Sequence, residues 1–181
     1  MNKSKHFTAI LFIALALTLP CCKAARKLTQ FTIKTTQTVI LPSTIGVNLP
    51  FNIITPPIPT NSMVEFERNN TNADLVESVQ LRRLRLKVIS PESGDFSFLK
   101  SVRVFQIAEG QPETQVAWRD NIPDNIGREM DLQTTNANLK AFLIKDKISL
   151  RVSTVADKLI ASEYHISLEA DFFVDARIFG L

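Results

Sequence analysis

Residues 164–178 read YHISLEADFFVDARI, and the order of side chains in this stretch decides the fold. Apolar side chains occupy every second position from Tyr164 to Ile178, and the residues between them are polar except for Phe173. A two-residue period is that of a β-strand, whose successive side chains point to opposite faces of a sheet. We therefore expect a long strand with one face in the core and the other in water.

Shorter segments repeat this pattern. Val, Ile and Thr make up 40 of the 160 residues that follow position 21, and β-branched residues favour strands. Ala156-Asp157-Lys158 is predicted to turn a hairpin between a strand at 148–152 and the strand at 164–178. The segment at 102–108 is apolar on both faces and is predicted to be a central strand. Further strands are expected at 31–33, 47–53, 64–66, 84–88 and 114–118.

Two features interrupt the strand pattern. Pro50 has no amide hydrogen to donate, so its strand is expected at a sheet edge or at a bulge. In the segment that contains Arg82 and Arg83, the apolar residues stand at odd positions before this pair and at even positions after it. A bulge at Arg82-Arg83, or a helical turn running into the strand, would reconcile the two registers.

Two short helices are predicted at 73–78 and 137–144, because Asn72 and Asn136 can cap their first turns. About eight antiparallel strands and two short helices define an all-β protein. We expect a two-layer β-sandwich, in which each strand buries one face against the other layer, and an immunoglobulin-like strand order is one arrangement of it. No long polar linker divides the chain, so residues 31–181 are predicted to form one domain.

The N-terminal residues have the composition of an export signal. Lys3 and Lys5 precede an uncharged apolar run of 13 residues from Phe7 to Leu19. A membrane-spanning helix needs about 20 residues, so the run is predicted to be the core of a cleaved signal peptide.

The run ends in Leu19-Pro20-Cys21-Cys22, which resembles the lipobox of bacterial lipoproteins. In that family, an apolar residue stands three places before a cysteine that is acylated and becomes N-terminal after cleavage. The resemblance implies that residues 1–21 are the signal peptide, that Cys22 is acylated and that residues 22–30 form a tether. Cys21 is the alternative acylation site, and Pro20 and Cys21 depart from the small residues usual at their positions.

Other roles for the two cysteines are less compatible with their spacing. A disulfide between neighbouring cysteines would be strained, and two thiols alone make an incomplete zinc site. Two or three acyl chains on one cysteine anchor a protein stably, so the partner that the resemblance implies is membrane lipid. The expected location is the bacterial cell envelope, and the lack of an acidic stretch after Cys22 favours an outer-membrane anchor facing the periplasm.

The charge of the chain excludes nucleic acid as an expected partner. The net charge of the full sequence is +3, and removal of residues 1–21 leaves 19 basic against 18 acidic side chains. Nucleic-acid-binding domains carry a clear excess of Lys and Arg.

Three acidic residues are candidates for a calcium site. Asp120, Asp124 and Asp131 stand among Asn, Pro and Gly residues, and Ca²⁺ takes oxygen ligands. Their spacing differs from that of an EF-hand loop, and Asp, Asn, Pro and Gly are also ordinary turn residues.

Two further groups are candidates for a binding surface. Trp118 and Arg119 could form an exposed stacking pair, although Trp118 is also compatible with a buried strand end. Arg82, Arg83 and Arg85 form a basic stripe that could contact lipid headgroups or polysaccharide phosphates. The alternative is a solvated strand face that also protects a sheet edge from aggregation.

No catalytic residue and no cofactor are predicted. His165, the one imidazole after residue 21, lies on the polar face of its strand, and the chain has no Gly-x-Ser-x-Gly motif and no phosphate-binding loop. We expect a non-catalytic binding or structural module with an envelope protein or polysaccharide as partner. A polysaccharide hydrolase that uses paired carboxylates and an accessory subunit of an envelope assembly are the alternatives.

Overall fold

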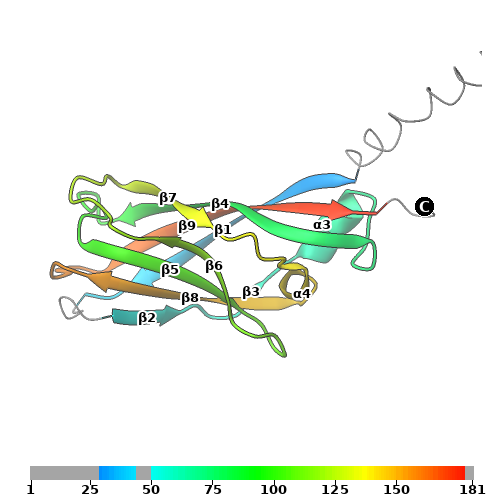
Figure 1. Cartoon of the computed structure of the whole chain (residues 1–181). Helices are drawn as coiled ribbons and strands as arrows, with labels where there is room; N and C mark the ends of the chain where they lie inside the picture. Colours follow the sequence, from blue (N-terminus) through cyan, green and yellow to red (C-terminus); the bar gives the residue numbers. More distant parts are fainter. Residues whose placement is uncertain (1–28, 44–49, 178–181) are drawn as a thin grey trace, which may run out of the picture.

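The computed structural model describes residues 29–43 and 50–177, and in these ranges it contains nine strands and two short helices (Figure 1). The predicted all-β class is therefore confirmed. The strands are β1 (Gln30–Leu41), β2 (Pro50–Ile54), β3 (Ile58–Pro59), β4 (Val76–Ser90), β5 (Leu99–Ile107), β6 (Thr114–Arg119), β7 (Glu129–Thr134), β8 (Lys147–Ala156) and β9 (Tyr164–Ala176). The helices are α3 (Ser62–Arg68) and α4 (Lys140–Leu143).

The strands form one curled antiparallel sheet in the order β1-β9-β4-β7-β6-β5-β8-β2, with the short β3 also paired to β8. The pairing is nested, because the first strand pairs with the last (β1–β9), and β2–β8, β4–β7 and β5–β6 follow inward. Each early strand of the chain therefore pairs with a late one.

Two finer predictions about the architecture differ from this sheet. Two stacked layers are not confirmed, because β7 pairs with both β4 and β6 and so joins the two halves of the sheet. The strand order also differs from the immunoglobulin one, in which the first two strands are neighbours, whereas here β1 and β2 lie at opposite ends of the order.

The strand at the centre of the first half, β9, matches its predicted alternation. Its inward side chains, from Ile166 to Ala176, are buried, and they pack into a core shared with the inner face of β5 and β8. The predicted central position of 102–108 is confirmed, since β5 pairs with both β6 and β8. Pro50 is the first residue of the edge strand β2, as its missing amide hydrogen requires.

The predicted bulge in β4 is also present. The register of β4 against β9 shifts between Leu81 and Arg83, and the buried residues change from odd to even positions across that shift. One extra residue on the bulged strand returns its apolar side chains to the core.

The predicted hairpin at Ala156-Asp157-Lys158 is wrong. The strands on either side of it, β8 and β9, do not pair with each other: β8 pairs with β5, β2 and β3, whereas β9 pairs with β1 and β4. The connection instead carries the chain from one half of the curled sheet to the other. Alternation within two strands fixes their faces, but it does not identify their neighbours.

The predicted strand at 64–66 is wrong, because these residues belong to the helix α3. Ser62 and Phe66 stand four residues apart and are both buried, as the helical repeat requires, while Val64 is 49% exposed. The ring of Phe66 contacts Phe31 of β1 edge-on, with 6.4 Å between the ring centroids. Long-range packing of one aromatic ring therefore outweighs the short alternating pattern.

The predicted helix at 73–78 is wrong, and the one at 137–144 is shorter than expected. The side-chain oxygen of Asn72 accepts hydrogen bonds from the amides of Asp74 and Leu75, which closes a turn just before β4. Of the range 137–144, α4 covers Lys140–Leu143, and Asn138 rather than Asn136 accepts a hydrogen bond from the amide of Lys140. The strand β7 had not been predicted.

The start of β1 lies at the same end of the domain as the end of β9 (Figure 1). Gln30 pairs with Asp175 at this end, and Leu41 pairs with Tyr164 at the opposite end. None of the helices within the described residues is long and apolar enough to cross a lipid bilayer. The predicted signal peptide and both cysteines lie outside the described residues.

The helical assignment of 62–68 leads to a stability prediction. Replacement of the fully buried Phe66 by Ala should lower the free energy of unfolding by about 3–5 kcal/mol, because it leaves a cavity in the core. The measurement is urea unfolding followed by circular dichroism. The matched control Val64→Ala should change that free energy by less than about 0.5 kcal/mol. A strand would place both residues on one face, so equal losses in the two variants would contradict the helix.

Candidate functional site

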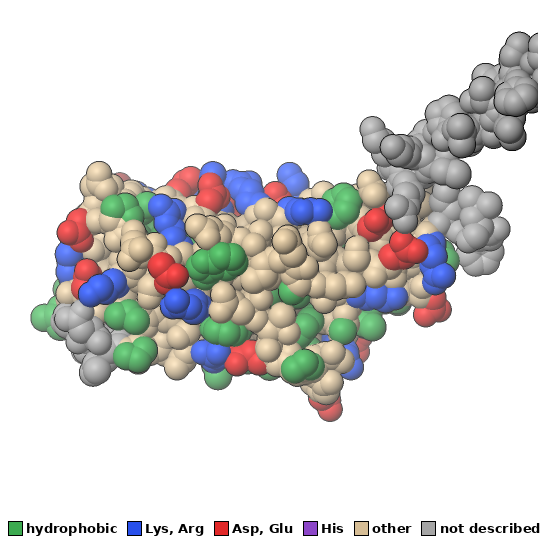
Figure 2. Space-filling view, viewed as in Figure 1, with side chains coloured by type: hydrophobic (Ala, Val, Ile, Leu, Met, Phe, Trp, Pro, Cys, Tyr) green, Lys and Arg blue, Asp and Glu red, His purple; other side chains and the backbone are tan. Residues whose placement is uncertain are grey.

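The basic stripe predicted on β4 lies on the outer face of the sheet, where acidic side chains of β7 bind it. Arg85 stands opposite Asp131, and its Nε and Nη2 donate to the two carboxylate oxygens at 2.9 and 3.0 Å. Lys87 stands opposite Glu129, with Nζ 2.8 Å from Oε1. Arg83 Nε lies 3.5 Å from Asp131 Oδ1. Figure 2 shows basic and acidic side chains side by side along the upper side of the domain.

Arg82 belongs to the same face and explains the one apolar residue on the outer side of β9. Its Cζ lies 5.2 Å from the centroid of the Phe173 ring, within the range of a cation–π contact. Phe173 is the residue that interrupts the polar positions of the 164–178 pattern. The bulge in β4 brings Arg82 over this ring while Arg83 stays beside the acids.

These ion pairs also set the ionisation of the stripe. A hydrogen bond to Asp131 raises the pKa of Arg85, and one to Glu129 raises the pKa of Lys87. The same bonds lower the pKa of both carboxyl groups. The stripe is thus bonded within the sheet, and β4 lies between β9 and β7 rather than at an edge. Binding of headgroups or polysaccharide phosphates by these arginines stays a prediction.

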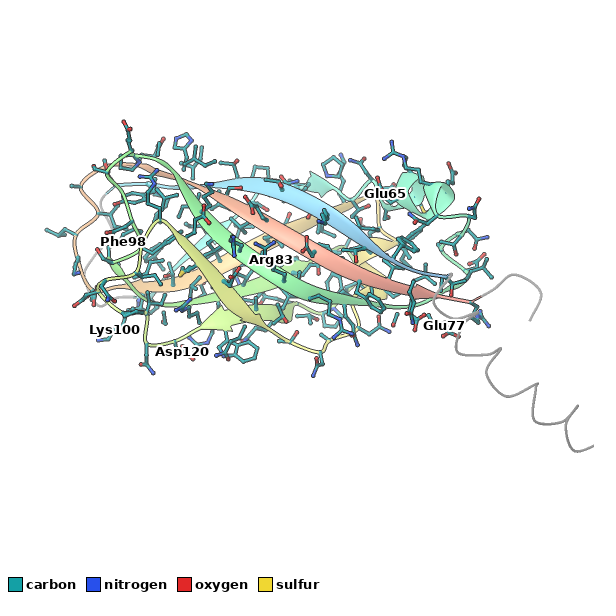
Figure 3. All side chains as sticks on the ribbon, turned by 90° about the horizontal axis from the view of Figure 1, so that it is seen from above. Glu65, Glu77, Arg83, Phe98, Lys100 and Asp120 are labelled. Atoms are coloured by element: carbon teal, nitrogen blue, oxygen red, sulfur yellow. The ribbon has the colours of Figure 1, made fainter. Side chains whose placement is uncertain are left out.

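Each of the three candidate calcium ligands forms an ion pair with a different basic side chain. Asp120 accepts a hydrogen bond from Arg103 at 2.9 Å, and Asp124 accepts one from Lys158 at 3.0 Å, whereas Asp131 binds Arg85. Figure 3 shows Asp120 well away from Arg83, which lies beside Asp131. Among the described residues, no group of three or more His, Cys, Asp or Glu side chains is placed to hold a metal ion.

The pair Trp118 and Arg119 ends β6, and both side chains are half-buried. Arg119 Nη1 donates a hydrogen bond to the backbone carbonyl of Asp131 at 3.0 Å, which links β6 to β7. Trp118 stands opposite Gln133 of β7 and Arg103 of β5 in the strand register.

His165 lies on the outer face of β9, as its strand position predicts. Its side chain is 40% exposed, and its Nε2 lies 2.9 Å from Glu163 Oε1. The pair lies at the end of the domain that contains Leu41, the last residue of β1.

A second arginine cluster on the outer face was not predicted from the sequence. Arg151 of β8 donates from Nε and Nη2 to the carboxylate of Glu113 at 2.5 and 2.9 Å, and from Nη1 to Asn52 of β2 at 2.7 Å. Its guanidinium also stacks over Phe105 of β5, 4.0 Å from the ring centroid. These contacts tie the edge strand β2 to β5 through β8. All three partners are far from Arg151 in the sequence, so no local motif could have revealed them.

The interior of the domain holds a cavity between the two halves of the sheet. The volume of this cavity is about 60 Å³, and its walls are mostly aliphatic. Gln106 of β5 lines this cavity, is 1% exposed, and has no hydrogen-bond partner among the described residues for either side-chain polar atom. The prediction that 102–108 is apolar on both faces missed Gln106. The signal that could have found it is its position, because Gln106 is polar and is in line with the inward residues Val102, Val104 and Ala108.

Comparisons with known proteins do not identify a family. The sequence matches no protein-family model and no curated protein. The structure overlaps with a solved structure of turnip yellow mosaic virus at 9% identity, covering 83% of this chain and 85% of that chain with a TM-score of 0.29. It overlaps with cocksfoot mottle virus at 9% identity, with the same coverages and a TM-score of 0.28.

The ion pairs predict how stability depends on pH. Hydrogen bonding to Arg151 lowers the pKa of Glu113 below its ordinary value of 4.5. Such a group stabilises the fold fully above the pKa of the unfolded chain, and this contribution is lost as the pH falls through the lower, folded pKa. Glu113→Gln should therefore make the loss of stability below about pH 4.5 shallower, measured by urea unfolding at a series of pH values.

The matched control for this measurement is Glu109→Gln, an exposed residue of the same β5–β6 loop. Its pH profile should coincide with that of the unmodified protein. A profile for Glu113→Gln that also coincides with it would show that the Arg151 pair contributes nothing to acid sensitivity.

Proposed function

We propose that this protein is a lipid-anchored lipoprotein of the bacterial cell envelope, and that its β domain acts by binding rather than by catalysis. The observation that carries the proposal is the ending Leu19-Pro20-Cys21-Cys22 behind a basic start and a short apolar run. Membrane lipid is the first partner, through acyl chains on Cys22. An outer-membrane location facing the periplasm is part of the proposal.

The position of β1 supports a close attachment to the membrane. Gln30 follows Cys22 by eight residues, and eight residues span at most about 29 Å when fully extended. The end of the domain that contains the start of β1 would therefore be held near the bilayer surface. The opposite end, where Leu41 pairs with Tyr164, would be directed away from it.

The membrane-distal end has features of a partner-binding surface. Ile40 and Ile89 are 49% and 52% exposed, and both lie next to the His165 position in the strand register. Leu159, in the loop before β9, is 75% exposed. Exposed apolar side chains that form a contiguous patch are typical of a protein contact surface, and the proposal is that these three take part in one. An envelope protein or polysaccharide is the proposed partner there.

Arg128 gives this end a fixed shape. Its guanidinium donates hydrogen bonds at 3.0 Å to the backbone carbonyls of Val88, Pro91 and Gly94, and it also binds the carbonyl of Glu92. One side chain thus holds the loop that follows β4. A preorganised loop loses less conformational freedom when it binds a partner.

The hydrolase alternative has less support from the acids of the domain. A glycosidase needs a general acid with a raised pKa, whereas contacts lower the pKa of Asp95, Glu113, Glu129 and Asp131. Turnover on a panel of envelope glycans, abolished by a single Asp→Asn or Glu→Gln change, would favour the hydrolase. Crosslinking in intact cells to one stable assembly would favour the accessory-subunit alternative.

The anchor leads to a localisation prediction. Cys22→Ala should abolish incorporation of a clickable fatty acid and shift the protein out of the membrane fraction, because it removes the acylated sulfur. The measurement is metabolic labelling followed by membrane fractionation and protease shaving of whole cells.

Cys21→Ala is the matched control and should keep both the label and the membrane location. Loss of the label in Cys21→Ala alone would move the anchor to that residue. Labelling and fractionation unchanged in both variants would overturn the proposed anchor.

A further inference from the structure

The interior cavity is lined in part by β1 and β3, two strands that no hydrogen-bond ladder joins. Thr35 and Gln37 of β1 line it, as do Ile58 of β3 and Thr60 just after that strand, and all four are half-buried. A small molecule could therefore enter without separating paired strands.

Gln106 gives the cavity a specific chemistry. Its side-chain amide offers two N–H donors and a carbonyl acceptor, and neither polar atom has a partner among the described residues. A buried amide without hydrogen bonds destabilises the fold, and such groups are rare in folded proteins. The register shift between Val104 and Phe105 lies directly before Gln106, and bulges are frequent beside functional sites.

The walls exclude a charged ligand. None of the described residues that line the cavity is acidic, basic or a histidine, and most are aliphatic, such as Leu81, Leu84 and Leu168. An unpaired charge in such surroundings carries a large desolvation penalty. The polar group of a ligand that reaches Gln106 must therefore be neutral.

The space available sets the size of the ligand. A second hollow of about 30 Å³ shares Leu168 with the first and is lined by aliphatic residues such as Val39, Leu86 and Val152. If one water-sized group takes 10–15 Å³, the first hollow accepts roughly four to six non-hydrogen atoms and the second roughly two to three. A ligand of the combined size requires that the two hollows join beside Leu168.

We propose that this cavity binds a small uncharged amphiphile, an aliphatic chain of a few carbons that ends in an amide or hydroxyl group, with that polar group hydrogen-bonded to Gln106. The chain lies against the aliphatic walls, and the molecule enters between β1 and β3. This site is independent of the acylation of Cys22, so a failure of the proposed ligand binding would leave the proposed anchor unaffected, and the reverse also holds.

The test uses the full chain in lipid nanodiscs, with hexanamide as the probe and NMR of the Gln106 side-chain amide as the readout. A residue-specific signal separates binding in the cavity from partition into lipid. Hexanamide should shift the Gln106 amide resonances saturably and give nuclear Overhauser contacts from its chain to Leu168. Hexanoate, which has the same chain and a charge, should bind at least about tenfold more weakly.

Gln106→Met keeps the length of the side chain and removes both hydrogen-bonding groups. This variant should fold, because the change removes two unpaired buried polar atoms, and it should bind hexanamide about tenfold more weakly, as followed by shifts at Leu168. The matched control Gln80→Met makes the same change at a half-buried position of β4 that does not line the cavity, and this variant should bind within about twofold of the unmodified protein.

Three outcomes would overturn the proposal. Hexanamide could leave the Gln106 resonances unshifted at millimolar concentrations. Hexanoate and hexanamide could bind equally, which would show non-specific partition. Gln106→Met could bind hexanamide as tightly as the unmodified protein, which would show that the buried amide serves no ligand.

Discussion

The double hydrogen-bonded ladder of β9 is the constraint on which the rest of the structure depends. β9 pairs along its length with β1 on one side and with β4 on the other. Because its side chains alternate strictly, a slip of one residue in either ladder would turn the apolar side chains of a neighbour into water. The bulge between Leu81 and Arg83 keeps β4 in phase with β9, so this apparent irregularity preserves the core.

On the outer face of the same strands, the basic stripe of β4 forms ion pairs within the sheet and so contributes to strand pairing. Viewed along the sequence, the arginines of β4 resemble a surface for an anionic partner. In the sheet, Arg85 and Lys87 stand directly opposite Asp131 and Glu129, and cross-strand pairs of opposite charge stabilise an antiparallel register. Each such exposed pair contributes little free energy, but like charges at these positions would oppose the pairing of β7 with β4. The pairing of β7 with β4 and with β6 joins the two halves of the curled sheet.

In the interior, the side-chain amide of Gln106 lacks hydrogen-bond partners, whereas the charged side chains on the outer face have them. Gln106 stands at an inward position that Val, Leu or Ile would fill at lower free energy. In a sequence that folds well, the local preferences of the residues, the apolar pattern and the packing of the core all specify the same structure. A residue that departs from this agreement is often functional. The cavity beside Gln106 gives this polar residue a physical role, whereas packing of the core alone does not.

The sequence by itself determined the class of the fold and the inward and outward faces of its strands. Alternation at 164–178, the parity change at Arg82-Arg83 and the missing amide hydrogen of Pro50 are local features, and each imposes a local geometry. The composition of the N-terminal segment likewise predicts a cellular location. The segment at 102–108 was interpreted as apolar on both faces, so the significance of Gln106 depended on what surrounds it in the fold.

The tertiary structure decided which strands are neighbours, and with them the candidate sites. Alternation does not encode the partner of a strand, so the crossing from β8 to β9 and the pairing of β7 had to come from the fold. The short pattern at 64–66 fits a strand or a helix equally, and the packing of Phe66 against Phe31 selects the helix. The cavity also arises from the fold, because strands from both halves of the sheet form its walls, and no segment of the chain contains that arrangement.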